Sequence, residues 1–220
     1  MGIVALSFDR YFKYFPDSVF AIGGRRRMAV VNVHCDARVP KSVSMVFTYG
    51  TLKRGFSNHN LMRELMNDGD ASFVGTHITE ERYPLVCGPY RVPFLLNLPG
   101  EEGAEHVVGE VYAVSARALE LMDELEGTTR GHYERLPIRV SPLSTGDVRG
   151  TPVSAEAYFA HPGYAEKMWI KSGRSGYREY GEKEASGYVR RKDRPEGVTF
   201  LEHIEAYLNQ SLNSKQSNKI

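Results

Sequence analysis

The sequence reads Met45-Val46-Phe47-Thr48-Tyr49-Gly50-Thr51-Leu52-Lys53-Arg54-Gly55 where its ordered pattern begins. The first five residues form a β-branched and aromatic run that stops at Gly50, which predicts a strand ending in a turn. Glycines at both ends of the turn let the backbone bend sharply and approach a ligand closely. Such a turn can aim successive backbone N–H groups at an anion, with Lys53 and Arg54 adding positive potential nearby. A plain turn with a solvated basic tip is the alternative.

Further short strands follow this turn, each a run of apolar residues bounded by turn formers. We expect them at 72–78, 84–87, 92–98, 107–114, 133–140 and 153–159. Helices are expected at 60–66, at 116–126 between an N-cap at Ser115 and a terminating Gly127, and at 200–208. Many short strands with few helices predict an α+β fold, a small mixed β-barrel or strongly curved sheet with flanking helices.

The 220 residues suffice for one domain with a hydrophobic core. Residues 1–44 have weak periodicity and an arginine triplet, so we expect an N-terminal extension that is partly disordered. Residues 45–208 form the expected domain. Residues 209–220 form a polar C-terminal tail.

The bulk composition excludes several classes of protein. The formal net charge is +1, and binding to nucleic acid through phosphate attraction needs a strong basic excess. No stretch approaches the ~20 apolar residues that span a bilayer. We therefore expect neither a nucleic-acid partner nor a membrane partner.

The cysteines indicate the compartment. Cys35 and Cys87 are too few for a secreted disulfide scaffold, and we expect both to be reduced. This predicts a cytoplasmic protein. Import into an organelle is the minority alternative, because Arg25–Arg27 would suit a targeting peptide while the acidic residues near them would not.

The second candidate motif is the acidic end of the helix expected at 116–126, Met122-Asp123-Glu124-Leu125-Glu126-Gly127. Glu126 lies in the last turn, where the helix carries partial negative charge. A carboxylate placed there and desolvated should have a raised pKa, as a general base working near pH 7 requires. An acidic, solvent-facing helix end is the alternative.

Two further segments have weaker signals. Tyr83–Val86 and Val92–Leu96 could form an apolar wall, although ordinary core strands are the stronger interpretation. Tyr188–Pro195 interleaves basic residues with a tyrosine, which could bind RNA. Nearby glutamates offset much of its charge, so we expect a solvated surface loop.

Five blocks occur together and in order over residues 45 to about 140. They are Tyr49–Gly55 with Asn58-His59, Tyr83–Val86, Val92–Leu96 with Leu98-Pro99-Gly100, Gly109–Val114 and Asp123–Glu126. In this order they resemble the γ-glutamylcyclotransferase-like family, specifically its γ-glutamylamine cyclotransferase and plant avirulence-induced branch. The resemblance implies a small β-barrel with flanking helices.

The resemblance also implies a site and a reaction. The turn of Tyr49, Gly50, Thr51 and Leu52 would hold the α-carboxylate and amine region of a small γ-glutamyl substrate. Glu126, and not Glu124, would be the general acid/base that helps the substrate cyclise to 5-oxoproline and release an amine. No metal or organic cofactor is needed, and we expect a monomer.

Three substrates remain as alternatives, and they differ in the amine that leaves. They are a γ-glutamyl amine such as γ-glutamyl-ε-lysine, a γ-glutamyl amino acid, and glutathione. A binding or regulatory protein of the same fold that lacks turnover is the alternative to the enzyme. We expect the segment 158–188 to cover the pocket mouth.

Overall fold

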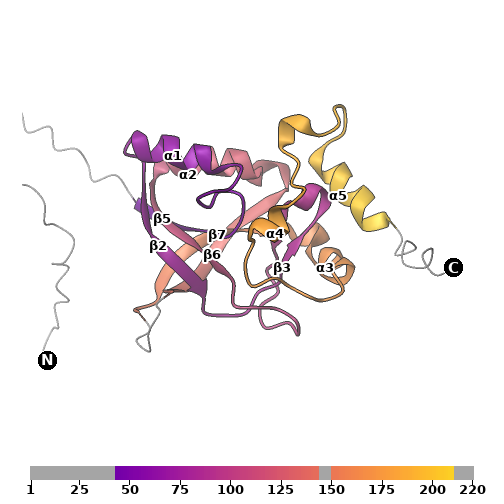
Figure 1. Ribbon diagram of the computed structural model, residues 1–220, viewed down its shortest axis with the longest axis horizontal. Helices are drawn as coiled ribbons and strands as arrows, with labels where there is room; N and C mark the ends of the chain where they lie inside the picture. The colour runs from indigo at the N-terminus through magenta and orange to yellow at the C-terminus, as the bar shows by residue number, and fades with distance from the viewer. Residues whose placement is uncertain (1–42, 144–149, 211–220) are drawn as a thin grey trace, which may run out of the picture. The chain divides into compact units, whose positions relative to one another are not determined.

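The computed structural model describes residues 43–143 and 150–210 (Figure 1). The extension expected over 1–44 therefore lies almost wholly outside the described residues, as does the tail from 211 onward. The domain limits proposed from the sequence remain predictions. No helix within the described part of the chain is both long and apolar enough to cross a membrane.

Seven strands form one mixed sheet that closes into a ring. The strands are β1 (Val43–Thr48), β2 (Ala71–Thr79), β3 (Leu85–Cys87), β4 (Pro93–Leu95), β5 (Val108–Ser115), β6 (Tyr133–Pro142) and β7 (Val153–Ala160). Their order is β1-β5-β2-β6-β7-β4-β3, and a parallel bridge from Val46 to Glu156 joins β1 to β7. Five strands thus make a closed barrel, with the β4–β3 hairpin attached to β7. The predicted mixed β-barrel is confirmed.

The alternation of side chains along the strands produces two hydrophobic clusters. One gathers alternate residues of β1, β5, β6 and β7, namely Phe47, Val111, Ile138, Val140, Ala155, Ala157 and Phe159. This is the pattern of a sheet face turned toward the inside of a ring. The other cluster includes Val46, Tyr112 and Val114 and packs them against helical residues such as Met62 and Met122.

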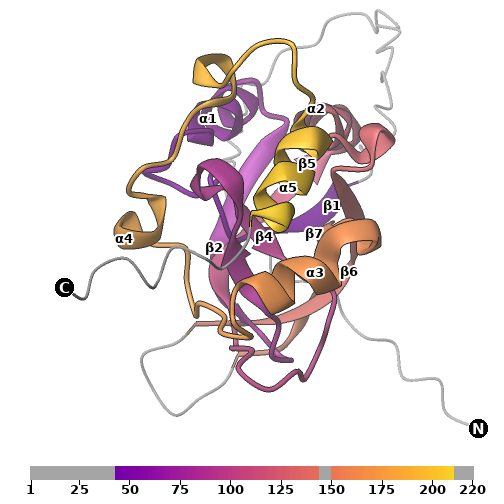
Figure 2. The same ribbon diagram turned by 90° about the vertical axis from the view of Figure 1, so that its right-hand side faces the viewer.

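Five helices accompany the sheet in the described residues. They are α1 (His59–Asn67), α2 (Ala116–Glu126), α3 (Pro162–Lys171), α4 (Glu182–Ala185) and α5 (Phe200–Asn209). Both views place α1 and α2 at the same end of the barrel, while α5 packs against α3 (Figures 1 and 2). Helix α3 was not expected from the sequence. Its buried Tyr164, Ala165, Met168 and Trp169 have helical spacing, and Pro162 occupies its first turn.

Helix α2 ends where the sequence predicted. Ser115 caps its N-terminus, because the side-chain oxygen accepts a hydrogen bond from the Ala118 N–H at 3.2 Å. Gly127 ends it in the left-handed conformation at φ 69°. A Cβ at this glycine would also lie 2.4 Å from Nδ1 of His132. The last residue of the helix, Glu126, is therefore held in a fixed position.

Candidate active site

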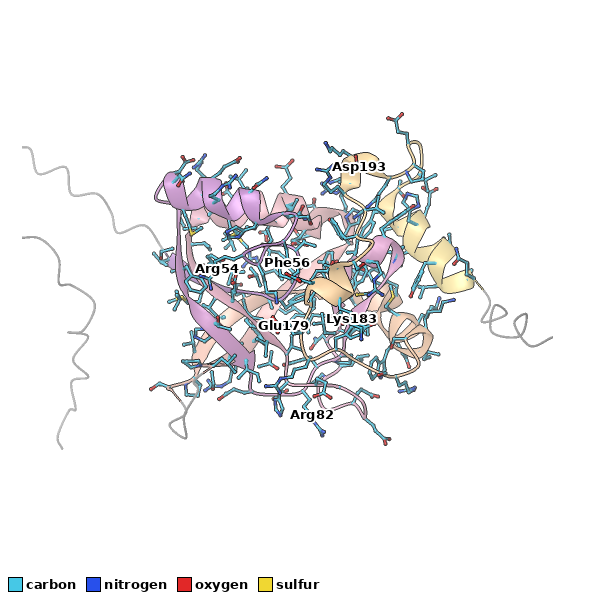
Figure 3. All side chains as sticks on the ribbon, in the orientation of Figure 1. Arg54, Phe56, Arg82, Glu179, Lys183 and Asp193 are labelled. Atoms are coloured by element: carbon cyan, nitrogen blue, oxygen red, sulfur yellow. The ribbon has the colours of Figure 1, made fainter. Side chains whose placement is uncertain are left out.

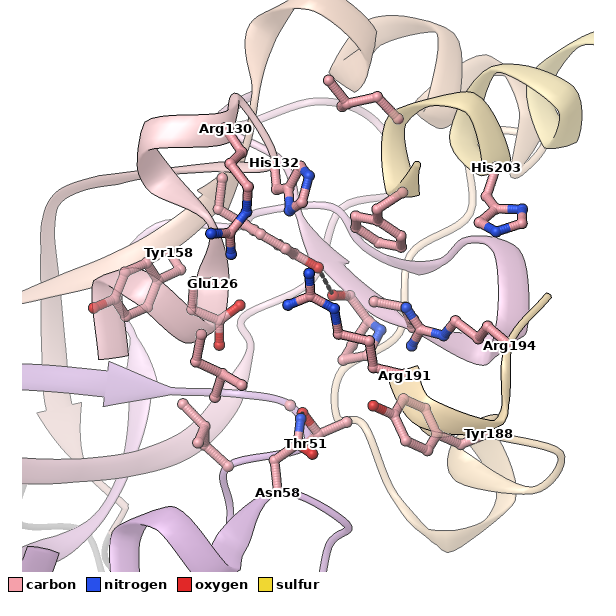
Figure 4. Close-up of a pocket in the computed structure, with 18 of the residues that line it drawn as sticks. Thr51, Asn58, Glu126, Arg130, His132, Tyr158, Tyr188, Arg191, Arg194 and His203 are labelled. Carbon is pink, nitrogen blue, oxygen red and sulfur yellow. Dashed lines mark hydrogen bonds between the residues drawn. The ribbon is translucent and has the colours of Figure 1, made fainter. Parts of the chain in front are cut away.

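A pocket of about 560 Å³ opens where the turn after β1 meets the end of α2 (Figure 4). All five site residues predicted from the sequence line it, namely Tyr49, Gly50, Thr51, Leu52 and Glu126. They come from two segments more than seventy residues apart in the chain. The remaining lining includes residues that follow α2 and residues near α5.

The turn after β1 is tied together by its own hydrogen bonds. The Lys53 N–H donates to the Gly50 carbonyl at 3.1 Å, and Asn58 donates from its backbone and its side chain to Thr51 at 3.0 and 2.9 Å. The backbone N–H groups of Gly50, Thr51 and Leu52 make no hydrogen bond to any other described residue. Consecutive unpaired N–H groups at a pocket wall suit a carboxylate.

Gly50 is required for space. Its φ is not in the left-handed region, but a Cβ there would lie 2.6 Å from Cγ of Pro93. Gly55, at the other end of the turn, has φ 87° and so does need the freedom of glycine. The expected sharp turn is present, and close packing against Pro93 explains the first glycine.

The two basic residues of the turn point away from the pocket. Lys53 is 4% exposed, and its Nζ lies 2.9 Å from a carboxylate oxygen of Glu179 and over the ring of Phe56. Figure 3 labels Glu179 and Phe56, which lie near each other. Arg54 pairs with Glu110 at 2.9 Å and stacks over Phe73. Neither lines the pocket. The alternative prediction of a solvated basic tip is therefore wrong for Lys53. Residues outside this turn supply the positive charge of the pocket.

Glu126 presents its carboxylate to the pocket (Figure 4). It makes no hydrogen bond or ion pair with any residue in the described ranges. Burial raises its pKa from the ordinary 4.5 to about 7, because the surrounding protein disfavours the charged form. The Glu126 side chain is half-buried and lines the pocket. Its protonation state therefore changes near neutral pH.

The other two acids of the motif are placed differently. Asp123 pairs with Arg135 at 2.9 Å and accepts a hydrogen bond from the Tyr158 hydroxyl at 2.8 Å. Glu124 is exposed and does not line the pocket. The alternative of a solvent-facing end holds for Glu124 and fails for Glu126.

Tyrosines enclose the space around Glu126. The Tyr49 hydroxyl donates to the Tyr158 carbonyl at 2.6 Å, and the Tyr133 hydroxyl donates to the Pro93 carbonyl at 3.0 Å. Burial, and then the charge of Glu126, raise the pKa of Tyr49 well above its ordinary value. These phenols stay protonated at neutral pH.

The basic side of the pocket was not predicted from the sequence. Arg130, His132, Arg191, Arg194 and His203 line it, and Figure 4 shows them around its opening. Burial, followed by the charges of Arg130 and Arg191, lowers the pKa of His132 to about 4, so this histidine is neutral at pH 7.

The segment Tyr188–Pro195 was expected to be a solvated loop. Arg191 and Pro195 are exposed, as expected of a surface loop, but they line the pocket together with the half-buried Tyr188 and Arg194. From the segment 158–188, only the two end residues line the pocket within the described chain, and the lining continues to His203. The closely spaced basic residues of Tyr188–Pro195 were the only sequence signal for this side of the pocket.

Of the two expected apolar wall segments, Val92 and Pro93 line the pocket, while Tyr83–Val86 does not. Among residues 43–143 and 150–210, no three His, Cys, Asp or Glu side chains lie where they could jointly hold a metal ion.

Comparison with known proteins identifies the family of the chain. Residues 46–178 match the sequence model of the family described as gamma-glutamyl cyclotransferase, AIG2-like. An Arabidopsis thaliana protein, provisionally named a gamma-glutamylcyclotransferase, is 50% identical over 181 residues, which are 79% of this chain and 96% of that protein. The Homo sapiens gamma-glutamylaminecyclotransferase is 43% identical over 102 residues, 46% of this chain and 64% of that protein.

A solved structure shows the same fold. The crystal structure of an AIG2-like protein from Mus musculus is 32% identical, with a TM-score of 0.57, and the alignment covers 69% of this chain and 99% of that one. Both the matched residues and the barrel lead to one conclusion: the chain belongs to the AIG2-like γ-glutamyl cyclotransferase family.

Proposed function

We propose that the protein cyclises a γ-glutamyl amine or γ-glutamyl amino acid to 5-oxoproline and a free amine, with Glu126 as general acid/base. The observation that carries this proposal is the placement of Glu126, with a pKa of about 7, in the same pocket as the unpaired N–H groups of Gly50–Leu52. One feature suits proton transfer near neutral pH, and the other suits the carboxylate of a glutamyl group.

The binding step selects one conformer of the substrate. The α-carboxylate accepts hydrogen bonds from the N–H groups of Gly50, Thr51 and Leu52, which fixes the α-amine relative to the γ-carbonyl. Because nucleophile and electrophile belong to one molecule, ring closure needs only the correct geometry. Such intramolecular positioning can lower a barrier by roughly 7–11 kcal/mol.

The chemical step transfers one proton through Glu126. The α-amine nitrogen attacks the γ-carbonyl carbon, and Glu126 accepts the proton that this nitrogen loses. The new C–N bond closes the five-membered ring. The old C–N bond then breaks, and Glu126 returns the proton to the departing nitrogen, so the carboxylate is regenerated. Acid–base catalysis of this kind contributes typically ~10²–10⁴-fold.

The test is release of 5-oxoproline, measured by mass spectrometry, from γ-glutamyl amines, γ-glutamyl amino acids and glutathione. Wild type is compared with Glu126→Gln and with Glu124→Gln, a matched control on the same helix that lies outside the pocket. We expect release by wild type and by the control, and loss in Glu126→Gln. Ligand binding without release in wild type would instead favour a catalytically silent binding protein.

A further inference from the structure

A segment beyond the family match closes one side of the pocket. The match ends at residue 178, and residues 179–199, here called the strap, continue to α5. The strap brings Tyr188, Arg191 and Arg194 to the pocket wall. This chain therefore completes its pocket with residues that lie outside the matched region.

Specific contacts hold the strap in place. Lys53 pairs with Glu179 at 2.9 Å, and the Val189 N–H donates to the Tyr90 carbonyl at 3.2 Å. Arg91 donates from Nε to the Glu184 carbonyl at 2.9 Å and accepts at its own carbonyl from Tyr180 at 3.0 Å.

The backbone at the attachment point is strained. Tyr90 and Arg91 both have φ 58°, a left-handed conformation that non-glycine residues rarely adopt. Both residues contact the strap, so its contacts help to offset this strain.

The charges on this side of the pocket are unbalanced. None of Arg130, Arg191 and Arg194 forms an ion pair with a carboxylate of the described residues, and Glu126 is the sole acidic residue among those that line the pocket. Arg130 donates to the Glu124 carbonyl at 2.6 Å, and Arg194 donates to the Val189 carbonyl at 3.1 Å and lies over Tyr90 and Phe200.

Arg191 differs from its neighbours. Its guanidinium makes no hydrogen bond or ion pair with any residue that the structure describes, and Figure 4 shows it pointing into the pocket, as the Glu126 carboxylate does. The adjacent Arg190 pairs with Asp193 at 2.9 Å and does not line the pocket. One arginine of this pair is thus available to a ligand, and the other is occupied.

We propose that Arg191, supported by Arg130, binds a carboxylate on the leaving amine, so that the substrates are γ-glutamyl amino acids or peptides with a free carboxylate. This inference rests on the proposed function and adds the leaving group to it. The turn of Gly50–Leu52 is matched to the carboxylate of the glutamyl part, which leaves the guanidinium groups for a second anion. Arginine suits carboxylates because its planar fork donates two parallel hydrogen bonds. The same guanidinium groups repel a leaving group that carries a net positive charge while it is bound.

The test compares γ-glutamylglycine with γ-glutamylglycinamide, which has nearly the same shape but lacks the second carboxylate. Binding of each compound is measured by calorimetry with Glu126→Gln protein, and kcat/KM is measured with wild type. Because Arg191 is exposed and solvent weakens its pairing with a carboxylate, we expect about a fivefold preference for γ-glutamylglycine. Arg191→Gln should remove most of the preference, and Arg190→Gln, the matched control, should keep it.

The outcomes separate this inference from the proposed function. Turnover of both compounds without preference, or an unchanged preference in Arg191→Gln, overturns the carboxylate site and leaves the cyclotransferase proposal standing. An Arg191-dependent binding preference without any turnover supports the carboxylate site and counts against the enzyme. Binding of neither compound overturns the carboxylate site.

Discussion

Replacing Glu126 with glutamine should stabilise the protein above neutral pH, in addition to stopping turnover. The carboxyl group has a pKa of about 7 in the folded chain and about 4.5 when exposed. Between these values the unfolded chain has lost the proton and the folded chain retains it, so raising the pH favours unfolding. The destabilisation begins near pH 4.5, grows through pH 7 and is constant above it. Glutamine has no ionisable proton, so the Glu126→Gln protein does not undergo this destabilisation.

The size of the effect follows from the two pKa values. Their difference of about 2.5, at about 1.4 kcal/mol for each pH unit, gives about 3 kcal/mol as an upper limit. Contact with water through the pocket reduces it, so we expect roughly 1–3 kcal/mol at pH 8.5. In a domain of this size that corresponds to about 2–10 °C in Tm.

The assay is urea unfolding of wild type and Glu126→Gln at pH 5 and pH 8.5. The difference in free energy of unfolding between the two proteins should be larger at pH 8.5 by about 1–2 kcal/mol. Glu124→Gln serves as the control, because the Glu124 side chain is exposed on the same helix and lies outside the pocket. A difference between wild type and Glu126→Gln that is the same at both pH values would refute the burial of an ionisable Glu126.

Three further substitutions test the surroundings of the site. Gly50→Val places a side chain against Pro93, where a Cβ alone would lie 2.6 Å from Cγ. Calorimetry should therefore detect no binding of a γ-glutamyl ligand, and the free energy of unfolding should fall by ~1–3 kcal/mol. Normal binding would contradict the role of this turn in binding the carboxylate. Glu179→Gln leaves the buried Lys53 ammonium without its ion-pair partner and should lower the free energy of unfolding by about 1–3 kcal/mol. This loss should exceed that of Lys53→Met, and a larger loss in Lys53→Met would show that the ion pair is unimportant. Ser115→Ala removes the cap of α2 and should cost about 0.5–2 kcal/mol in the same assay, whereas an unchanged unfolding midpoint would rule out a stabilising cap.

Local signals predicted the parts of the site that depend on neighbouring residues. The strand that stops at Gly50 and the helix that runs from Ser115 to Gly127 were predicted because caps, terminators and β-branched runs act within a few residues. The family resemblance then selected Glu126 from three adjacent acids. Its burial depends on tyrosines from distant strands, so the sequence motif alone did not distinguish it from Glu124.

The strap could not be predicted, because its position depends on contacts with residues far away in the chain. Tyr188–Pro195 has the composition of a surface loop. The strap is attached through distant residues, for example by the hydrogen bond from the Val189 N–H to the Tyr90 carbonyl and the hydrogen bond from Arg91 to the Glu184 carbonyl. The same limit explains the length of β4, which spans Pro93–Leu95 and not the expected 92–98. The Leu96 N–H still donates to the Pro84 carbonyl opposite it, but Pro84 has no N–H to donate in return, so the pairing with β3 ends there.

The most direct test of the account is the pH dependence of kcat/KM for 5-oxoproline release. If Glu126 must be ionised to accept a proton, the slope of log(kcat/KM) against pH should fall by one as the pH passes about 7. Glu126→Gln should show no measurable release at any pH. A wild-type profile without a change of slope between pH 5.5 and 8.5, or release by Glu126→Gln at the wild-type rate, would contradict the role of Glu126.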